Sequence, residues 1–379
     1  MPEIRVLVID DSVVVRRLLT ESLQEEPDLR VVAAAANGKI GLDRLAQTDP
    51  DVVILDIEMP VMDGLETLSA IRRVNRRIPV IMFSTLTERG AEATLEALSR
   101  GATDYLTKPT GTGGLQQSRQ RLRSELAPRI RQLCGVRVPA RPAPTAGQAT
   151  GEGPPVRRPP RARSRVDVLV VGVSTGGPVA LERLFSALPG DLGVPVVVVQ
   201  HMPPLFTGML AERLDRCSPL QVAEASDGIP VAPGMAWIAP GDRHLLLART
   251  DSGVVLRTSE DPPVNFCRPA VDVLFGSAAD TYGPNVLGVV MTGMGQDGLR
   301  GSQRIVDEGG SVLAQDQASS VVWGMPGYVA QAGLAEAVLP LDQLAPALTS
   351  RIRERNRPSR LSVAAPPPPI SHRTSTWTA

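Results

Sequence analysis

The chain has 379 residues, with 40 basic and 40 acidic side chains and therefore no formal net charge at neutral pH. This length leaves room for two domains, each with a core of its own. The balanced charge argues against a protein that works mainly by coating nucleic acid or an anionic membrane.

Cysteine usage and the lengths of the apolar segments narrow the cellular setting. The three cysteines, Cys134, Cys217 and Cys267, are far apart and odd in number, which fits neither a disulfide framework nor a zinc site. The N-terminal residues include an early acidic pair and do not read as a signal peptide, and no apolar run approaches the roughly 18 residues of a membrane span. We therefore expect a soluble protein of the reducing cytoplasm.

Two segments lack the apolar periodicity of a folded domain. Residues 136–165 consist largely of Pro, Arg, Ala, Gly and Thr, and residues 351–379 include four consecutive prolines. Such compositions are typical of extended or disordered chain. We expect domains at 1–125 and 166–350, a linker at 126–165 and a disordered Pro-rich tail beyond. The arginines near the end of the linker form either a basic contact patch or simply a solvated charged segment.

The first domain alternates apolar segments with helical patterns. The first apolar segment, for example, precedes a helical pattern that starts at Ser12 and carries Val14, Leu18 and Leu19 at helical spacing. This alternation predicts an open, mostly parallel sheet with helices on both faces, which binds ligands at the carboxyl ends of its strands. The expected strands are residues 4–9, 31–35, 52–55, 80–83 and 104–106.

Polar residues stand where these expected strands end. Asp10 and Asp11 follow the first strand, Asp56 the third, Ser84 the fourth and Lys108 the fifth. Three carboxylates on one rim repel one another unless a cation is bound, and hard oxygen ligands suit Mg²⁺. A lysine and a hydroxyl opposite them suit a phosphoryl group. Each carboxylate alone could equally cap a helix, but the five residues together favour the phosphoryl site.

These motifs closely resemble a two-component receiver domain over essentially its full length. The matching residues are Asp10-Asp11, the segment 55–64, Ser84 and Lys108-Pro109. The resemblance implies a flavodoxin-like, five-stranded parallel sheet in which Asp56 accepts a phosphoryl group from a histidine kinase. By the same resemblance, Mg²⁺ is bound by Asp11, Asp56 and the Glu58 backbone carbonyl, and Asp10 assists through a water molecule. Ser84 and Lys108 would contact the phosphoryl oxygens. Tyr105 takes the position of the switch aromatic residue.

The second domain opens on a serine between glycines. Apolar residues 168–173 run into Ser174, and Pro178 suits the first turn of a following helix. The sequence 172–176 matches the G-x-S-x-G elbow, in which a sharp turn exposes a nucleophilic serine at a helix N-terminus that can hold an oxyanion. Two alternatives stay open. One is a Rossmann-type phosphate-binding turn, which requires glycine at position 174. In the other, Ser174 only caps the helix.

Two later apolar segments place a histidine and an aspartate at matching positions. Residues 195–200 precede His201, and residues 286–291 run into a glycine-rich stretch that contains Asp297. Continuous β-branched runs are typical of strands buried in a parallel sheet, whose carboxyl ends share one rim. The second domain is therefore expected to be doubly wound and mostly parallel, with Ser174 on the same rim.

The set of three favours a nucleophilic triad. His201 is the only one of three histidines expected at the end of a buried strand, because His244 follows a turn motif and His372 lies in the tail. Alone, His201 could be a core histidine and Asp297 a helix cap. Beside Ser174, they supply the base that a serine needs and the carboxylate that orients that base.

Residues 166–348 resemble the chemotaxis protein-glutamate methylesterase family, in which a receiver precedes such a domain. The motifs that carry the resemblance are residues 172–178, 200–203, 239–244, 292–298 and 324–326. It implies Ser174, His201 and Asp297 as the triad and the Met294 backbone N–H as an oxyanion donor. The implied substrates are γ-glutamyl methyl esters and selected glutamines on chemoreceptors. Cys267 stands where such sequences often carry a histidine.

Three functions are weighed on this basis. The leading hypothesis is a phosphorylation-activated hydrolase that needs no metal for hydrolysis, since three histidines cannot supply both a zinc site and a base. A receiver-controlled, non-catalytic signalling adaptor is the alternative, although all three triad residues are intact. A DNA-binding regulator is disfavoured because the second domain shows no basic recognition helix.

Overall fold

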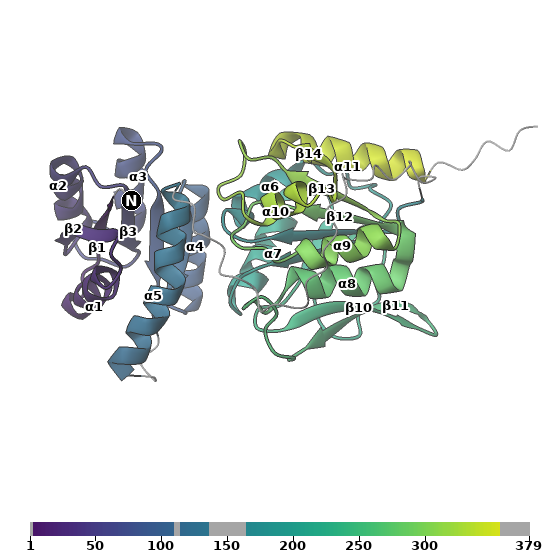
Figure 1. Ribbon diagram of the computed structural model, residues 1–379, viewed down its shortest axis with the longest axis horizontal. Coiled ribbons are helices and arrows are strands. Elements are labelled where there is room, and N and C mark those ends of the chain that lie inside the picture. Colours follow the sequence, from purple (N-terminus) through teal and green to yellow (C-terminus); the bar gives the residue numbers. More distant parts are fainter. Residues whose placement is uncertain (1–2, 110–113, 136–163, 357–379) are drawn as a thin grey trace, which may run out of the picture.

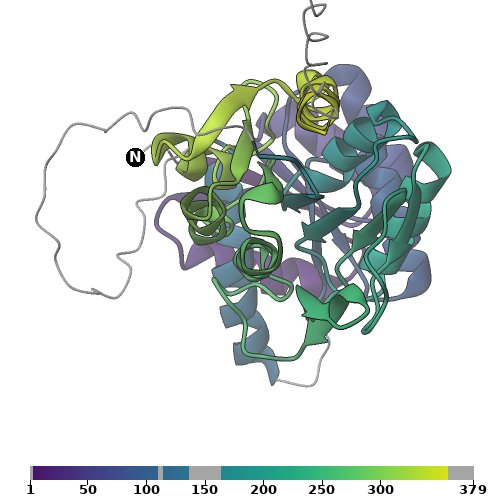
Figure 2. The same cartoon turned by 90° about the vertical axis from the view of Figure 1, so that its right-hand side faces the viewer.

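The computed structural model describes residues 3–109, 114–135 and 164–356, which fold into two α/β domains. They lie side by side in Figure 1, and in Figure 2 the second domain stands in front of the first. Residues 136–163, most of the expected linker, and residues 357–379 of the expected tail lie outside the described residues. No helix in the described ranges combines the length and the apolar composition that a membrane crossing needs.

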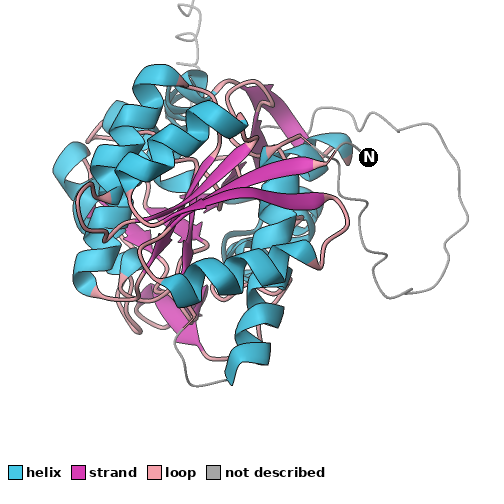
Figure 3. Ribbon diagram, turned by 90° about the vertical axis from the view of Figure 1, so that its left-hand side faces the viewer, coloured by secondary structure: helices cyan, strands magenta, loops and turns pink. Residues whose placement is uncertain are grey.

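Five parallel strands in the order β2-β1-β3-β4-β5 form the sheet of the first domain. β3 and β4 are buried along their whole length, as continuous apolar sequences predict for central strands. Helices cover both faces (Figure 3): α1 and α5 pack on one, and α2, α3 and α4 on the other. The expected doubly wound fold is confirmed. The elements are β1 (Ile4–Ile9), α1 (Val13–Gln24), β2 (Leu29–Ala35), α2 (Gly38–Thr48), β3 (Val52–Asp56), α3 (Gly64–Val74), β4 (Val80–Ser84), α4 (Glu88–Ser99), β5 (Asp104–Thr107) and α5 (Gly114–Leu133).

Seven parallel strands in the order β14-β13-β12-β6-β7-β9-β8 form the second sheet. From β6 the chain builds the sheet outward through β7 and later returns to add β12 on the other side, which creates a switch point of the kind where open α/β sheets bind ligands. α6, α7 and α11 pack on one face, and α8, α9, α10 and the antiparallel hairpin β10–β11 on the other. The elements are β6 (Val168–Val173), α6 (Gly177–Ala187), β7 (Val196–Gln200), α7 (Phe206–Cys217), β8 (Gln221–Glu224), β9 (Met235–Ile238), β10 (His244–Thr250), β11 (Gly253–Ser259), α8 (Val271–Tyr282), the 3₁₀ turn η2 (Gly283–Asn285), β12 (Val286–Val290), α9 (Leu299–Asp307), β13 (Ser311–Gln315), α10 (Met325–Gln331), β14 (Ala335–Leu339) and α11 (Leu341–Arg355).

Two helices extend past the domain ends that we expected from composition. Residue 125 lies inside α5, whose later residues Leu126 and Ile130 are buried in the first domain's core. Residue 350 lies inside α11, where Ile352 is buried against the second sheet. Each helix packs as one element, so the packed core of each domain reaches further along the chain than composition alone indicates.

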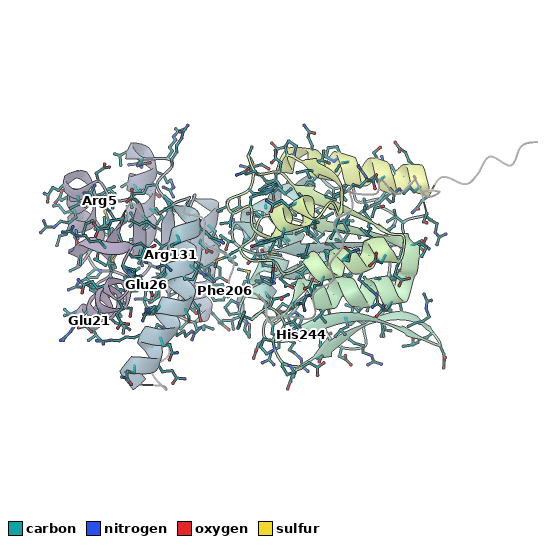
Figure 4. All side chains as sticks on the ribbon, viewed as in Figure 1. Arg5, Glu21, Glu26, Arg131, Phe206 and His244 are labelled. Atoms are coloured by element: carbon teal, nitrogen blue, oxygen red, sulfur yellow. The ribbon has the colours of Figure 1, made fainter. Side chains whose placement is uncertain are left out.

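The two domains share an apolar contact. α4 packs against α6 and α7, and Figure 1 shows α4 and α5 on the side of the first domain that faces the second. The rings of Tyr105 and Phe206 stack across the boundary, with centroids 5.1 Å apart and planes inclined by 11°. Figure 4 places Phe206 where the domains meet. The contact buries Tyr105 and raises the pKa of its hydroxyl above the usual value.

Candidate active site

Three neighbouring strands of the second sheet lead into Ser174, His201 and Asp297. Ser174 follows β6, His201 follows β7, and Asp297 lies in the loop after β12. Backbone hydrogen bonds connect the strand ends, because the Ser174 N–H donates to the Thr292 carbonyl at 3.0 Å and the His201 N–H to the Val173 carbonyl at 3.2 Å. The sheet topology thus brings the three residues to one rim, as the sequence predicts.

The turn that carries Ser174 depends on close backbone packing. Gly176 has a φ of 77° and is the N-cap of α6, which no side chain caps. A Cβ at Gly293 would lie 2.8 Å from Ser174 Cβ, so that position has room only for glycine. Gln200 Nε2 donates to the Ser174 carbonyl oxygen at 3.0 Å and holds the turn from β7. The alternative in which Ser174 only caps the helix is therefore wrong.

Asp297 is 2% exposed and accepts hydrogen bonds on both carboxylate oxygens. Burial alone would raise the pKa of Asp297, but the bonds from His201 and the backbone hold it below its usual value, so the group is ionised at neutral pH. α9, the helix that follows, has no side-chain cap; Asp297 instead receives the first N–H groups of α8. The donors are His201 Nε2 (2.8 Å), Asn265 Nδ2 (2.9 Å), and the N–H groups of Val271 (2.6 Å), Asp272 (3.1 Å) and Gly298 (3.1 Å).

The other imidazole nitrogen of His201 faces Cys267. Because Nε2 bonds Asp297, Nδ1 is the nitrogen left to serve Ser174, and Cys267 Sγ lies 3.6 Å from it. Among the described residues, Ser174 Oγ has no hydrogen-bond partner. Burial lowers the pKa of His201, but the contacts with Cys267 and Asp297 outweigh burial and raise it above its usual value. The Cys267 thiol therefore lies near the same nitrogen, His201 Nδ1, that would serve the Ser174 hydroxyl.

The backbone beside Ser174 offers a donor for a developing negative charge. The Gly293 carbonyl accepts the N–H groups of Gly324 and Met325, which fixes the peptide units that follow β12. The Met294 N–H, one residue on, donates to no group in the described part of the chain. Met294 directly follows Gly293, which packs closely against Ser174. A free backbone N–H at this point of the chain is compatible with the predicted oxyanion donor.

Asn265 is a neighbour of the triad that sequence reasoning missed. Its Nδ2 donates to Asp297 Oδ1 at 2.9 Å and to Asp272 Oδ2 at 2.8 Å, so one amide separates two carboxylates. Burial and the nearby Asp297 charge raise the pKa of Asp272. The only signal in the sequence is that Asn265 stands two residues before Cys267, in a segment already singled out for its cysteine.

His244 differs from the expected position in a turn. It is the first residue of β10 and is 1% exposed. Its Nε2 bonds the Pro262 carbonyl at 3.2 Å, and its Nδ1 accepts the Ala270 N–H at 3.2 Å. Figure 4 shows it in the second domain, near the hairpin β10–β11. Both ring nitrogens are hydrogen-bonded to the backbone, so His244 has a structural role. Its position in a strand, and not in a turn, gives it these partners.

The first domain gathers its predicted polar residues at one rim. Lys108 Nζ lies 2.9 Å from Asp10 Oδ2 and 2.8 Å from Asp56 Oδ2. Burial raises the pKa of Asp56 to about 6; Lys108 opposes this rise and the Asp10 charge adds to it. Ser84 is buried and accepts a hydrogen bond from Thr94 Oγ1 at 2.9 Å.

The same rim fits a divalent cation. Carboxylate oxygens of Asp10, Asp11 and Asp56 lie within 4.8 Å of one another. Apart from Lys108, the buried oxygens Asp10 Oδ2 and Asp56 Oδ2 have no donor among the described residues. Ser12, not Asp11, caps α1, and a pocket of about 560 Å³ that Asp11 and Glu58 line adjoins the carboxylates. One lysine cannot neutralise three carboxylates, and hard oxygen donors suit Mg²⁺.

A cleft between the domains opens onto the rim that carries Ser174. The cleft has a volume of about 740 Å³, and Ser174 and His201 line it together with residues of β5 and α5. Asp104, on β5, accepts hydrogen bonds from Thr175 Oγ1 at 3.4 Å and from Arg129 at 2.8 Å. The first domain thus contacts the residue directly after Ser174.

Comparisons with known proteins agree with this geometry. The family model described as "CheB methylesterase" matches residues 169–348, and the one described as "Response regulator receiver domain" matches residues 6–119. A protein of Nocardioides sp. named protein-glutamate methylesterase/protein-glutamine glutaminase is 52% identical over 368 residues, covering 96% of this chain and 100% of that protein. A relative of the same name from Trichodesmium erythraeum is 48% identical over 93% of this chain and 100% of its own length.

The chain belongs to the protein-glutamate methylesterase/protein-glutamine glutaminase family. Its first domain is a receiver domain and its second a methylesterase domain. Among solved structures, the catalytic domain of Thermotoga maritima CheB methylesterase is 43% identical, with a TM-score of 0.48 over 49% of this chain and 98% of that chain. Membership of this family favours neither the non-catalytic adaptor nor the DNA-binding regulator.

Proposed function

We propose that this protein hydrolyses γ-glutamyl methyl esters on chemoreceptors, and deamidates selected glutamines there, under the control of phosphorylation at Asp56. The observation that carries the proposal is the hydrogen bond of 2.8 Å between His201 and the ionised, buried Asp297, on the rim that also holds Ser174. The names of the relatives supply the substrate class, and the receiver domain supplies the control.

The triad chemistry follows from the contacts of each residue. Ser174 Oγ attacks the ester carbonyl carbon while His201 Nδ1 takes its proton. The Met294 N–H stabilises the resulting oxyanion, and Asp297 stabilises the imidazolium through Nε2. His201 returns the proton to the leaving methoxide, so methanol departs and a glutamyl-serine ester remains. Water, deprotonated by the same imidazole, then cleaves that ester and restores Ser174. With a glutamine substrate the leaving group departs as ammonia.

Substrate binding has to rearrange the resting site in one respect. Ser174 is not yet hydrogen-bonded to His201, whereas Cys267 Sγ is 3.6 Å from Nδ1. Hydrogen bonds of unliganded catalytic sites often tighten only in the substrate complex. We infer that an ester seated in the cleft brings Ser174 Oγ to Nδ1 and displaces the thiol from it.

Control begins at the rim of the receiver domain. Asp56 is the phosphoryl acceptor, and Ser84 and Lys108 contact the phosphoryl oxygens. Asp11, Asp56 and the Glu58 backbone carbonyl would hold Mg²⁺, with Asp10 assisting through water; the ion would neutralise charge on the transferring phosphoryl group. A histidine kinase supplies that group.

β5 then carries the signal across the domain boundary. Lys108 follows directly after β5, which also holds Tyr105 and Asp104, and these two contact Phe206 and Thr175 of the methylesterase domain. A shift of β5 on phosphorylation would loosen both contacts and open the cleft to the receptor. Regulation of this kind needs a two-state interface that a local charge biases.

The partners and the cellular compartment of the protein follow from the two reactions proposed above. A chemoreceptor that bears glutamyl methyl esters is the substrate, and a chemotaxis histidine kinase is the phosphodonor, which places the protein in the cytoplasm with the kinase. The hydrolytic reaction uses no cofactor in this proposal. Mg²⁺ serves only the receiver domain.

One assay tests the proposed function. Methanol release is measured from a methylated chemoreceptor fragment, with and without a small phosphodonor and Mg²⁺. We expect release by the intact protein, an increase with phosphodonor, and none by the Ser174→Ala variant. Equal release by wild type and Ser174→Ala would refute the esterase chemistry.

A further inference from the structure

Residues 264–267 form a tight turn at the mouth of the cleft. The Val264 N–H donates to the Cys267 carbonyl at 3.1 Å, and the Cys267 N–H returns a bond to the Val264 carbonyl at 2.9 Å. The two central residues, Asn265 and Phe266, have φ values of 52° and 64°. Positive φ at both central positions defines a type I′ turn, for which Asn-Gly is the favoured pair.

Phe266 therefore occupies a position that suits glycine. A bulky residue in the left-handed region is strained, and such strain persists only where the surroundings impose it. Here the surroundings are the turn's own hydrogen bonds and the amide of Asn265, which Asp272 and Asp297 hold. The strain is a local property of this turn.

The Phe266 ring gains nothing from packing in return. Its residue is 100% exposed, the most exposed large hydrophobic residue in the described ranges. Folding therefore strains the backbone at Phe266, and no burial of the ring offsets that strain. A strained residue without such compensation is a candidate for function.

The position of the ring identifies what it can contact. Cys267, the next residue, has its Sγ 3.6 Å from His201 Nδ1, and Phe266 lines the same cleft as Ser174. Full exposure excludes a contact with the receiver domain in this state. A substrate whose ester group reaches Ser174 would bring its neighbouring surface close enough to cover the Phe266 ring.

We propose that Phe266 is a docking residue for the substrate protein, seating against aliphatic side chains that flank the glutamyl ester. The proposal rests on the proposed function and adds the feature that distinguishes a protein substrate from a small ester. An exposed aromatic ring buries a large apolar area on contact and loses little conformational freedom, because it has two side-chain torsions. The strained turn fixes its direction in advance, which reduces the entropy lost on binding.

The test compares Phe266→Gly with wild type on two substrates. One is a methylated chemoreceptor fragment, and the other is the γ-methyl ester of N-acetylglutamate, which has no flanking side chains. We expect Phe266→Gly to lower kcat/KM for the receptor fragment by about 30-fold, mainly through KM, as for an aromatic interface anchor. Turnover of the small ester should stay within about two-fold of wild type, since the triad is untouched. The melting temperature should rise, because glycine relieves the turn.

Two control variants separate docking from exposure and from strain. Val74→Ala removes an apolar side chain that is 75% exposed at the end of α3, and should change neither substrate's kinetics. Asp49→Gly relieves a φ of 40° at the end of α2, and should raise the melting temperature with no kinetic effect. Equal loss on both substrates for Phe266→Gly, or no loss on the receptor fragment, overturns the proposal.

A binding measurement keeps the proposal separate from the proposed function. Affinity for the methylated fragment is measured for Ser174→Ala and for Ser174→Ala combined with Phe266→Gly. If wild type releases methanol from neither substrate, the proposed function fails, and weaker binding by the double variant still supports docking. Equal affinities of the two variants overturn the docking role whatever the hydrolysis result.

Discussion

Asp104 Oδ2 in the receiver domain accepts a hydrogen bond, at 3.4 Å, from Thr175 Oγ1 in the methylesterase domain. Thr175 is the residue after Ser174, and Asp104 begins the strand that leads to Lys108. Only a short stretch of backbone therefore separates each end of this bond from a reacting group. We regard the bond and the Tyr105–Phe206 stack beside it as the contact that phosphorylation releases.

Loss of the Asp104 carboxylate should raise basal hydrolysis. Asp104→Ala removes the acceptor for Thr175, and the unphosphorylated protein should then release methanol faster, within the 5–150-fold range typical of allosteric coupling. Asp43→Ala, an exposed aspartate on α2, is the control and should have no effect. Methanol release without phosphodonor is the measurement. An unchanged basal rate in Asp104→Ala, with phosphorylation intact, would show that this bond does not restrain the enzyme.

Phosphodonor stimulation should depend on Asp56. With Mg²⁺ and a small phosphodonor, the intact chain should be stimulated, whereas Asp56→Ala should stay at the basal rate because it lacks the carboxylate that accepts the phosphoryl group in our proposal. A chain that starts after Gly135 should be active without phosphodonor and insensitive to it. The cut belongs there rather than at residue 125, since α5 continues to Leu133. Wild-type stimulation of Asp56→Ala would refute control through this residue.

The triad variants should rank by role. Ser174→Ala and His201→Ala should each lower kcat by about 10⁶-fold, and Asp297→Asn by about 10⁴-fold, as in other serine hydrolases. Single-turnover methanol release from a methylated receptor fragment gives the three rates. Near wild-type turnover by Ser174→Ala would contradict the assignment, and circular dichroism of that variant establishes that the fold is retained.

The pH profile should respond to Cys267. Its contact, with that of Asp297, raises the pKa of His201, and only the neutral imidazole can take the Ser174 proton. The acidic limb of kcat/KM should therefore lie at higher pH than for an ordinary histidine. Cys267→Ala removes one contact, so the His201 pKa falls and the limb moves to lower pH. The hypothesis fails if kcat/KM, measured from pH 5 to 10, shows a limb that stays in place or moves upward.

Chelation should separate the two reactions of the chain. Basal methanol release should persist in excess chelator, because the triad needs no metal in our proposal. Stimulation by phosphodonor should be lost, since Mg²⁺ is needed at Asp11 and Asp56. Both rates come from one preparation, with Mg²⁺ restored as the control. Complete loss of basal release, recovered with zinc, would contradict metal-free hydrolysis.

Strand ends were predictable because buried parallel strands leave a strong sequence pattern. Continuous apolar runs identified the strands that carry Asp56, Ser174 and His201, and parallel pairing then places their ends on a common rim. The sequence around a single residue indicated its role less well where that residue could lie either in a turn or in a strand. His244 follows a turn motif in sequence, yet it enters a strand and bonds two backbone groups from distant segments.

Contacts that depend on tertiary packing left no pattern to read. Nothing at Asn265 marks it as the link between two carboxylates, and nothing at Phe206 marks it as the partner of Tyr105. Both arise from segments that only the fold brings together. The domain ends shifted for a different reason. Composition placed the boundary at residue 125, but the buried face of α5 continues beyond it through Leu126 and Ile130 at helical spacing.

The carboxylate of Asp297 has two roles. It orients His201, and it accepts hydrogen bonds from the first N–H groups of α8. The second role belongs to folding and persists whether or not the protein catalyses anything. A family member that had lost its chemistry could therefore retain this aspartate for stability alone. Among related sequences, an intact aspartate is weak proof of activity, and Ser174, whose side chain caps no helix, is the position whose loss would identify a chain that has become a pure binding module.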